Sequence, residues 1–176
     1  GLLYFEELNN LVKENFSEIN YENKNILEVG GGNTWGLMPF FAKHNALNYT
    51  NIDIILDKNI INSKFVWRKY LKKISQYITE TKINNLIFNN YECKIEDLNN
   101  DSKFDVVVSV SCLEHIDDIN SFFKQIKRFT HPDTVHIHVV NFTNHLSKKN
   151  PFKYMYENDK NYFLDNFKTK INLLRL

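Results

Sequence analysis

One stretch near the N-terminus constrains the fold more than any other part of the chain. The apolar run Ile26–Val29 carries one acid, Glu28, and leads directly into three consecutive glycines at positions 30–32. The residues that follow are predicted to open a helix, with Thr34 as its N-cap. Glycine allows a tight turn and close approach of a ligand to the backbone, and a helix N-terminus offers unpaired N–H groups. The stretch therefore predicts a strand, a turn and a helix that bind a nucleotide-like ligand.

Apolar runs and helical periodicities alternate along the chain. Short apolar runs predict strands at residues 26–29, 49–55, 86–93, 104–110 and 134–140. Apolar residues at helical spacing predict helices over residues 2–16, 60–82 and 151–167, and a further one after its expected cap, Asp117. Strands that alternate with helices favour an α/β fold, with a doubly wound, mostly parallel sheet and helices on both faces.

The helix expected at residues 60–82 has a basic face. Its apolar positions recur every three or four residues, and the positions between them carry Lys64, Arg68, Lys69, Lys72 and Lys73. This face is either solvated or a docking surface for an acidic partner or substrate.

Composition argues against several classes of protein. The formal net charge is +1, so no overall basic field favours nucleic acid as a partner. No apolar run approaches the roughly 20 residues that cross a bilayer, so no membrane insertion is expected. Cys93 and Cys112 lack metal-like spacing and flank apolar runs, so we expect buried, reduced thiols and a cytoplasmic location.

The glycines fit the dinucleotide fingerprint Gly-x-Gly-x-x-Gly poorly. Counted from Gly30, the sixth position is Trp35, and Gly36 comes one residue late. A bulky indole would stand where the helix and the strand approach most closely. An NAD-linked oxidoreductase is therefore the less favoured alternative.

Several motifs together resemble those of the class I, Rossmann-like, S-adenosylmethionine-dependent methyltransferases. The run Glu28-Val29-Gly30-Gly31-Gly32 is similar to the first motif of that family, an acid followed by x-Gly-x-Gly. Asp53 is similar to the family's ribose-binding acid, and it follows the glycines at close to the expected distance of about 20 residues. The segment from Phe104 to Ile116, which contains Leu-Glu-His, resembles the fourth-strand motif, and residues 128–132 resemble the helix end before strand five. The resemblance covers residues 24–142.

The resemblance implies S-adenosylmethionine as the cofactor and assigns residues to it. Glu28 would fix the glycine loop or take the ammonium group, directly or through water, and Asp53 would accept hydrogen bonds from both ribose hydroxyls. Ile95 and Glu96 would frame the adenine, because Lys94 stands where the family often has an acid. The implied cofactor-binding residues are Glu28, Gly30, Gly31, Gly32, Asp53, Ile54, Ile95, Glu96, Ser109 and Val110.

Methyl transfer requires an acceptor held close to the methyl group and, for a hydroxyl or a protonated amine, a base. His115 follows the fourth strand and His145 follows the fifth, so both are expected at the carboxyl edge, where open α/β sheets bind ligands. Both are catalytic candidates, since an unperturbed imidazole pKa near 6.5 suits the role. Pocket lining is the alternative for His115. His136, His138 and His145 lack compact ligand spacing, so no metal is expected.

A weaker resemblance concerns the acceptor. Residues 111–114 lack both the Asn/Asp-Pro-Pro-aromatic motif of amino-methylating DNA enzymes and the Pro-Cys nucleophile of cytosine-C5 enzymes. Residues 138–145 and 150–152 loosely resemble bacterial methyltransferases found with surface-polysaccharide genes. This implies a small-molecule or glycan acceptor, namely a hydroxyl of a sugar or nucleotide sugar in surface-polysaccharide biosynthesis. The alternative is a non-catalytic cofactor-binding module that acts with a partner.

A single domain is expected over residues 1–176. It comprises an N-terminal helix (1–24), the cofactor-binding core (25–142) and a substrate-side or C-terminal segment (143–176). A complete fold of the resembled family adds a C-terminal antiparallel hairpin, and the tail at 170–176 could supply one of its strands at most. The fold is therefore expected to be abbreviated, or the sequence to be cut short. Nothing in the sequence predicts the oligomeric state.

Overall fold

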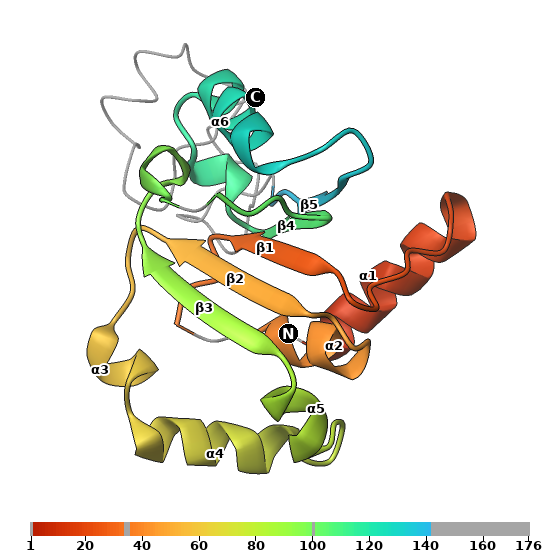
Figure 1. The fold of residues 1–176 in the computed structure, drawn as a ribbon, viewed down its shortest axis with the longest axis vertical. Coiled ribbons are helices and arrows are strands. Elements are labelled where there is room, and N and C mark those ends of the chain that lie inside the picture. Colours follow the sequence, from red (N-terminus) through yellow and green to blue (C-terminus); the bar gives the residue numbers. More distant parts are fainter. Residues whose placement is uncertain (1, 34–35, 100, 142–176) are drawn as a thin grey trace, which may run out of the picture.

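A parallel sheet forms the centre of the molecule. The computed structural model describes residues 2–33, 36–99 and 101–141, and within these ranges it has a five-stranded sheet (Figure 1). The strands are β1 (Asn25–Val29), β2 (Asn48–Asp53), β3 (Ile87–Glu92), β4 (Val106–Val110) and β5 (Val135–Val139). Their order is β3-β2-β1-β4-β5, and every pairing is parallel. The predicted strands and the open parallel α/β fold are confirmed.

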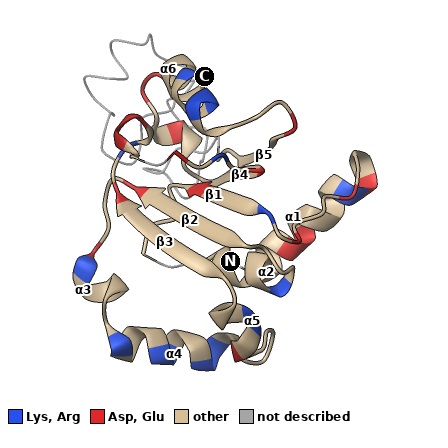
Figure 2. Cartoon of the chain, in the orientation of Figure 1, with Lys and Arg blue, Asp and Glu red and all other residues tan. Residues whose placement is uncertain are grey.

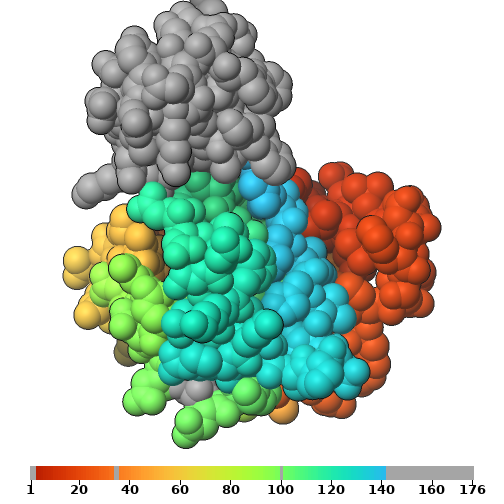
Figure 3. Space-filling view, turned by 90° about the horizontal axis from the view of Figure 1, so that it is seen from above, coloured from red at the N-terminus to blue at the C-terminus, as the bar shows by residue number. Residues whose placement is uncertain are grey.

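Helices connect the strands and cover both faces of the sheet. The helices on one side are α1 (Leu2–Asn15), α2 (Met38–Lys43), α3 (Lys58–Ile61), α4 (Lys64–Ile74) and α5 (Glu80–Asn84). The other side has α6 (Ile119–Ile126) and short 3₁₀ turns at η1 (Ile95–Asp97), η2 (Leu113–His115) and η3 (Lys127–Phe129). Figure 3 shows α6 beside the segment that leads into β5, with α1 at the flank. No described helix combines the length and the apolar composition needed to cross a membrane.

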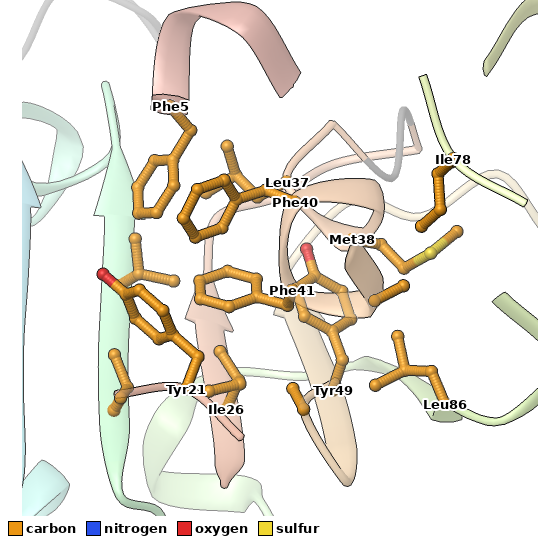
Figure 4. Close-up of a cluster of buried hydrophobic side chains, with 14 of the residues drawn as sticks. Phe5, Tyr21, Ile26, Leu37, Met38, Phe40, Phe41, Tyr49, Ile78 and Leu86 are labelled. Carbon is orange, nitrogen blue, oxygen red and sulfur yellow. The ribbon is translucent and has the colours of Figure 1, made fainter. Parts of the chain in front are cut away.

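Aromatic rings dominate the core beneath α1 and α2 (Figure 4). Phe5 of α1 meets Phe40 of α2 edge to face, with ring centroids 4.8 Å apart, and Phe41 packs on Tyr49 of β2 at 5.7 Å. Edge-to-face pairs of this kind add to the free energy gained from burial alone. This packing holds α2 against the sheet and so fixes the end of the connection that begins at the glycine turn.

A second core lies between the sheet and α6. Its buried residues include Leu27 of β1 and Val107 of β4, which pack with Phe122 and Ile126 of α6. Val106 and Val108 belong to the first core, since successive strand residues point to opposite faces. The apolar run of β4 is therefore buried on both faces, as expected for a central parallel strand.

Asp105 stands at the opposite edge of the sheet from the carboxyl ends of the strands. Its Oδ2 accepts a hydrogen bond from the Asn25 backbone N–H at 2.8 Å, and its Oδ1 lies 3.4 Å from Lys24 Nζ. The same Oδ1 lies 3.5 Å from His131 Nε2. These contacts join the starts of β1 and β4 to the turn before β5, which is a structural role.

The prediction of one long helix over residues 60–82 is wrong. The segment is divided among α3, α4 and α5, and the first two of these helices have N-caps of their own. Asp57 Oδ1 accepts from the Asn59 backbone N–H at 2.8 Å, and Ser63 Oγ accepts from the Val66 N–H at 3.3 Å. Each cap satisfies N–H groups that a continuous helix would bond internally, so a new helix begins at each one.

Two predicted caps are also wrong. The helix after the glycine turn begins at Met38 with Leu37 in the N-cap position, so Thr34, which lies outside the described residues, does not cap it. The cap of α6 is Asp118, whose Oδ1 accepts from the Ser121 N–H at 2.9 Å, and not Asp117. The helix expected over residues 151–167 and the tail strand lie outside the described residues.

Candidate active site

The carboxyl ends of β1 and β4 lie side by side where the strand order changes direction. The chain passes from β1 outward to β2 and β3, and then returns to place β4 on the other side of β1. In open α/β sheets the crevice at such a switch point is where ligands bind. The glycine turn, residues 30–32, leaves β1 at this point, and η2 leaves β4 there.

Gly30 lies against the chain that follows β4. Its φ is +78°, and a Cβ at this position would overlap the Sγ of Cys112 and stand 2.6 Å from its Cβ. Both the backbone conformation and the contact require glycine. The Gly30 N–H donates to the Ile52 carbonyl at 2.8 Å, which extends the pairing of β1 with β2 into the turn.

Gly31 covers two polar side chains of the sheet. A Cβ on Gly31 would stand 2.5 Å from Asn51 Oδ1 and 2.6 Å from Glu28 Oε2. Glu28 and Asn51 are direct partners in the pairing of β1 with β2. The absence of a side chain at position 31 therefore allows the turn to lie directly over this carboxylate and this amide.

The carboxylate of Glu28 is buried without full hydrogen bonding. The residue is only 4% exposed, and its Oε2 has no hydrogen-bond partner in the part of the chain that the structure describes. Burial, reinforced by the negative charge of Asp53, raises the pKa of Glu28 to about 8. A cationic group bound nearby would favour the ionised form and offset this cost.

Asp53 ties the glycine turn to the end of β2. Its Oδ2 accepts from the Gly32 backbone N–H and its Oδ1 from the Ile55 backbone N–H, both at 2.9 Å. An ionised carboxylate has about four acceptor sites, so each oxygen can accept a further hydrogen bond. Asp53 is partly exposed, and its carboxylate is therefore both held in place and accessible.

Asn51 is a site residue that the sequence analysis missed. It is fully buried, and its Nδ2 donates to the Gly32 carbonyl and to Asn90 Oδ1, both at 3.0 Å. The amide therefore links the glycine turn, β2 and β3. The sequence did contain a pattern that could have identified Asn51. It lies two residues before Asp53, so the two side chains are on the same face of the strand.

Glu114 is a second residue whose role the sequence analysis missed. It lies in η2 after β4 and is 2% exposed. Its Oε1 accepts from the Asn141 backbone N–H at 3.3 Å, which joins η2 to the chain after β5. No described residue offers a partner to its Oε2. A second buried carboxylate oxygen is thus left unsatisfied at this edge of the sheet.

The field at this edge is negative. Burial, and next the charges of Asp53, Glu114 and Glu28, together raise the pKa of the Cys112 thiol to about 12. Cys112 and Cys93 are both free, but each is partly exposed, so the expectation of buried thiols is wrong. The reason is that both follow the carboxyl ends of their strands, beyond the packed core.

Three of the implied cofactor-binding residues, Ile54, Ile95 and Glu96, differ in accessibility. Ile54, after β2, is 64% exposed, whereas Ile95 is 5% exposed and packs in the second core. Ile95 therefore has only backbone groups to offer a ligand. Glu96 is exposed, and its Oε1 lies 3.7 Å from Lys94 Nζ.

Ser109 and His138 form a polar pair between β4 and β5. Ser109 Oγ lies 2.8 Å from His138 Nδ1, and Ser109 is fully buried, while Val110 beside it is half-buried. The rings of His136 and His138 are 5.6 Å apart, as expected for alternate residues of one strand. Burial, and the neighbouring His136, lower the pKa of His138 to about 4, so this ring is neutral at physiological pH. Among the described residues, no three His, Cys, Asp or Glu side chains are grouped to hold a metal.

Of the two candidate bases, His115 lies within the described residues. His115 ends η2 at the carboxyl edge, where the sequence analysis expected it, and its backbone N–H donates to the Cys112 carbonyl at 2.9 Å. His145 lies outside the described residues.

The sequence matches a family model described as a methyltransferase domain over residues 3–175. The chain therefore belongs to this family of methyltransferase domains. No curated protein matches the chain.

Solved structures with a similar fold include several methyltransferases. A protein from Listeria monocytogenes, assigned as an S-adenosylmethionine-dependent methyltransferase, is 20% identical with a TM-score of 0.52, over 82% of this chain and 57% of its own. The YcgJ protein from Bacillus subtilis is 16% identical with a TM-score of 0.52, over 80% and 53%. The DhpI–SAH complex is 16% identical with a TM-score of 0.50, over 80% and 60%. The chain thus spans little more than half the length of these proteins.

Proposed function

We propose that the chain binds S-adenosylmethionine at the carboxyl edge of β1, β2 and β4 and transfers its methyl group to a small-molecule acceptor. The observation that carries this proposal is the unsatisfied, buried Oε2 of Glu28 directly beneath the glycine turn. A buried carboxylate with no partner is costly, and a bound cation offsets that cost. This cofactor carries two cationic groups, a sulfonium and an ammonium.

The charges at the site favour this cofactor over a dinucleotide. Asp53, Glu114 and Glu28 all raise the pKa of Cys112, so three carboxyl groups lie near one point of the edge, and Glu28 adds its negative charge when it ionises. The pyrophosphate of NAD would add negative charge to this field, whereas S-adenosylmethionine would add positive charge.

The chain's own residues suit each part of the cofactor. Glu28 would hold the ammonium, directly or through water, and Asp53 would accept hydrogen bonds from the ribose hydroxyls while it keeps Gly32 in place. The remaining implied residues, of which Ile54 is the most exposed, would contact the cofactor through apolar surface or backbone groups.

Bound S-adenosylmethionine supplies a methyl group on a positively charged sulfur, which leaves as a neutral thioether. The protein has to position the acceptor, exclude water and remove a proton from a hydroxyl. His145 and His115 are the proposed bases, since each follows a strand at the carboxyl edge.

For the acceptor, we propose a hydroxyl of a sugar or nucleotide sugar in bacterial surface-polysaccharide biosynthesis. The support is the similarity of residues 138–145 and 150–152 to methyltransferases found with such genes. This reaction would be an O-methylation in the cytoplasm.

Calorimetry with S-adenosylhomocysteine and with NAD tests the cofactor. We expect heat of binding with S-adenosylhomocysteine and none with NAD, and the reverse result would overturn the proposal.

A turnover screen of nucleotide sugars with S-adenosylmethionine tests the acceptor. Cofactor binding without any turnover would instead support a non-catalytic cofactor-binding module.

A substitution separates catalysis from binding. His145→Ala is expected to lower turnover while leaving the affinity for S-adenosylhomocysteine unchanged, because a base contacts the acceptor and not the cofactor. His115→Ala is the comparison at the other candidate position. Normal turnover in either variant removes that histidine as the base.

A further inference from the structure

The outer face of α4 is strongly basic. Helical spacing places its apolar residues toward the first core, where Trp67, Tyr70 and Leu71 are partly buried and Ile74 is buried. The remaining positions form an exposed face, which we call the α4 basic face. It consists of Lys64, Phe65, Arg68, Lys69, Lys72 and Lys73. Figure 2 shows basic residues along the length of α4, which lies at the opposite end of the sheet from α6 in this view.

The charge of this face has no local compensation. From Lys58 to Thr79 the sequence has no acid, and none of the five α4 cations forms an ion pair with another described residue. The chain as a whole carries a net charge of only +1, so the basic charge is concentrated here. Acidic residues instead occur at the carboxyl ends of β2 and β3, where the ribbon of Figure 2 is red.

This arrangement costs the helix stability. Lys64 and Arg68, Arg68 and Lys72, and Lys69 and Lys73 are each four residues apart, and like charges at this spacing repel. Lys72 and Lys73 lie in the last turn, where they complement the helix dipole, but Lys64 is the first helical residue, where a cation is unfavourable. A face that contacts only water would not require cations at positions where they repel one another or oppose the helix dipole.

An exposed aromatic ring shares the face of the cations, in the first turn of α4. Phe65 is 76% exposed, and it precedes Arg68 by three residues, Lys69 by four and Lys72 by seven, so all three lie on its side of the helix. Cations that share a face with an exposed apolar ring match a lipid surface. The cations attract anionic headgroups, and the ring enters the boundary between the headgroups and the acyl chains.

We propose that the α4 basic face is a docking surface for an anionic lipid membrane. The helix would lie in the plane of the interface with Phe65 inserted, and the protein would bind peripherally, without a membrane-spanning segment. A nucleic acid fits the observations less well. It would offer partners to the cations, but the net charge of +1 gives the chain no overall basic field to attract a phosphate backbone.

Vesicle co-sedimentation of the full chain tests the proposal. The protein is expected to bind vesicles of phosphatidylcholine with phosphatidylglycerol, to bind vesicles of phosphatidylcholine alone much more weakly, and to be released by high salt. The double variant Lys69→Gln/Lys72→Gln is expected to lower the partition coefficient by about 30-fold, since each cation near an anionic surface contributes about a factor of five. Phe65→Ser is also expected to weaken binding.

Matched controls carry the same changes elsewhere. Lys124→Gln/Lys127→Gln removes two exposed cations near α6, and Phe16→Ser removes a ring that is 85% exposed after α1. Both controls are expected to bind like the unmodified chain, and circular dichroism checks that every variant is folded. An equal loss in both lysine pairs, or no binding to anionic vesicles, overturns the proposal. So does binding to a nucleic acid that depends on Lys69 and Lys72 when vesicles do not bind.

Discussion

At the scale of single residues, the site depends on carboxyl groups that have two functions. They stabilise the fold through hydrogen bonds, and they are also available to bind a ligand. Asp53 is the clearest case, because each of its oxygens already accepts one backbone N–H and each has room for another. Its two functions can be separated by experiment, since loss of a ligand contact and loss of a structural contact have different consequences.

Asp53→Ala is expected to weaken binding of S-adenosylhomocysteine by about 1–3 kcal/mol, the range for a hydrogen bond to a charged group. Calorimetry measures this loss. Asp53→Asn is the matched variant, because it keeps one oxygen acceptor and removes the charge, so its loss should be smaller. Thermal unfolding shows how much of the effect is structural. Unchanged affinity in Asp53→Ala would mean that this residue does not bind the ribose.

Glu28 is expected to release a proton when the cofactor binds. Burial, and next the charge of Asp53, raise its pKa to about 8, so near pH 7 it is mostly protonated. A bound ammonium favours the carboxylate, and affinity should therefore rise with pH between about 6 and 8, by up to tenfold per unit. Calorimetry in buffers of different ionisation enthalpy counts the protons released. Glu28→Gln should abolish the release, and a wild-type count near zero would contradict the proposed contact.

Single residues also mark the limit of prediction from sequence. Glu28, Gly30 and Asp53 could be identified because a motif places them at fixed distances along the chain. Asn51 and Glu114 could not, because their importance arises from contacts between strands distant in sequence. Asn51 reaches Asn90 across the sheet, and Glu114 reaches the chain after β5.

At the scale of elements, the glycine turn combines two different constraints. Gly31 has no space for a side chain, because Asn51 and Glu28 occupy it, whereas a Cβ on Gly32 would meet nothing closer than Asp53 Oδ2 at 4.0 Å. Gly32 is constrained mainly by its φ of +60°. The two neighbours therefore allow a crowded position to be compared with a conformationally strained one.

Gly32→Ala is expected to lower the free energy of unfolding by about 1–2 kcal/mol, the cost of a left-handed conformation for an L-residue. Gly31→Ala is expected to cost more and to weaken cofactor binding strongly, because two buried polar side chains must move. Urea unfolding and calorimetry on both variants measure the difference. Equal losses in the two variants would show that contact with Glu28 and Asn51 is unimportant.

The elements differ in how well their patterns predict them. The strands could be predicted because a buried parallel strand needs a continuous apolar run, as in Val106–Val110. The breaks within residues 60–82 were missed, since the apolar spacing continues through Ser63 while its hydroxyl starts a new helix. The apolar spacing favours one continuous helix, whereas the Ser63 cap favours a new one. The hydrogen bond of the cap decides between them, and it cannot be seen in the spacing of apolar residues.

At the scale of the whole molecule, charge is separated between two ends. The carboxyl edge holds buried acids, and α4 holds uncompensated cations at another end of the fold (Figure 2). The sum of charges, +1, conceals this separation, so composition alone could not reveal it. The topology reveals it, because the sheet gathers the acids from β1, β2 and the segment after β4 at one edge.

A buried carboxyl group and a half-buried imidazole make the stability of the ligand-free protein depend on pH in opposite directions. The folded state raises the pKa of Glu28 from 4.5 to about 8, so between these values it binds more protons than the unfolded chain. The contribution of Glu28 to the free energy of unfolding therefore falls as pH rises, by up to about 1.4 kcal/mol per pH unit. The folded state lowers the pKa of His138 from 6.5 to about 4, so between these values the unfolded chain binds more protons. That contribution rises with pH, and it is smaller because His138 is only partly buried.

The free energy of unfolding is therefore expected to fall from about pH 6.5 to about pH 8, where Glu28 acts alone, and to change less between about pH 4.5 and 6.5, where the two groups oppose each other. Urea unfolding across this range measures the profile. Glu28→Gln should remove the decline on the alkaline side, and His138→Gln should leave that decline in place while it removes the opposing contribution at lower pH. A profile that stays flat above pH 6.5 would mean that Glu28 is already ionised in the folded, ligand-free protein, and the buried carboxylate would then need a partner other than a bound cation.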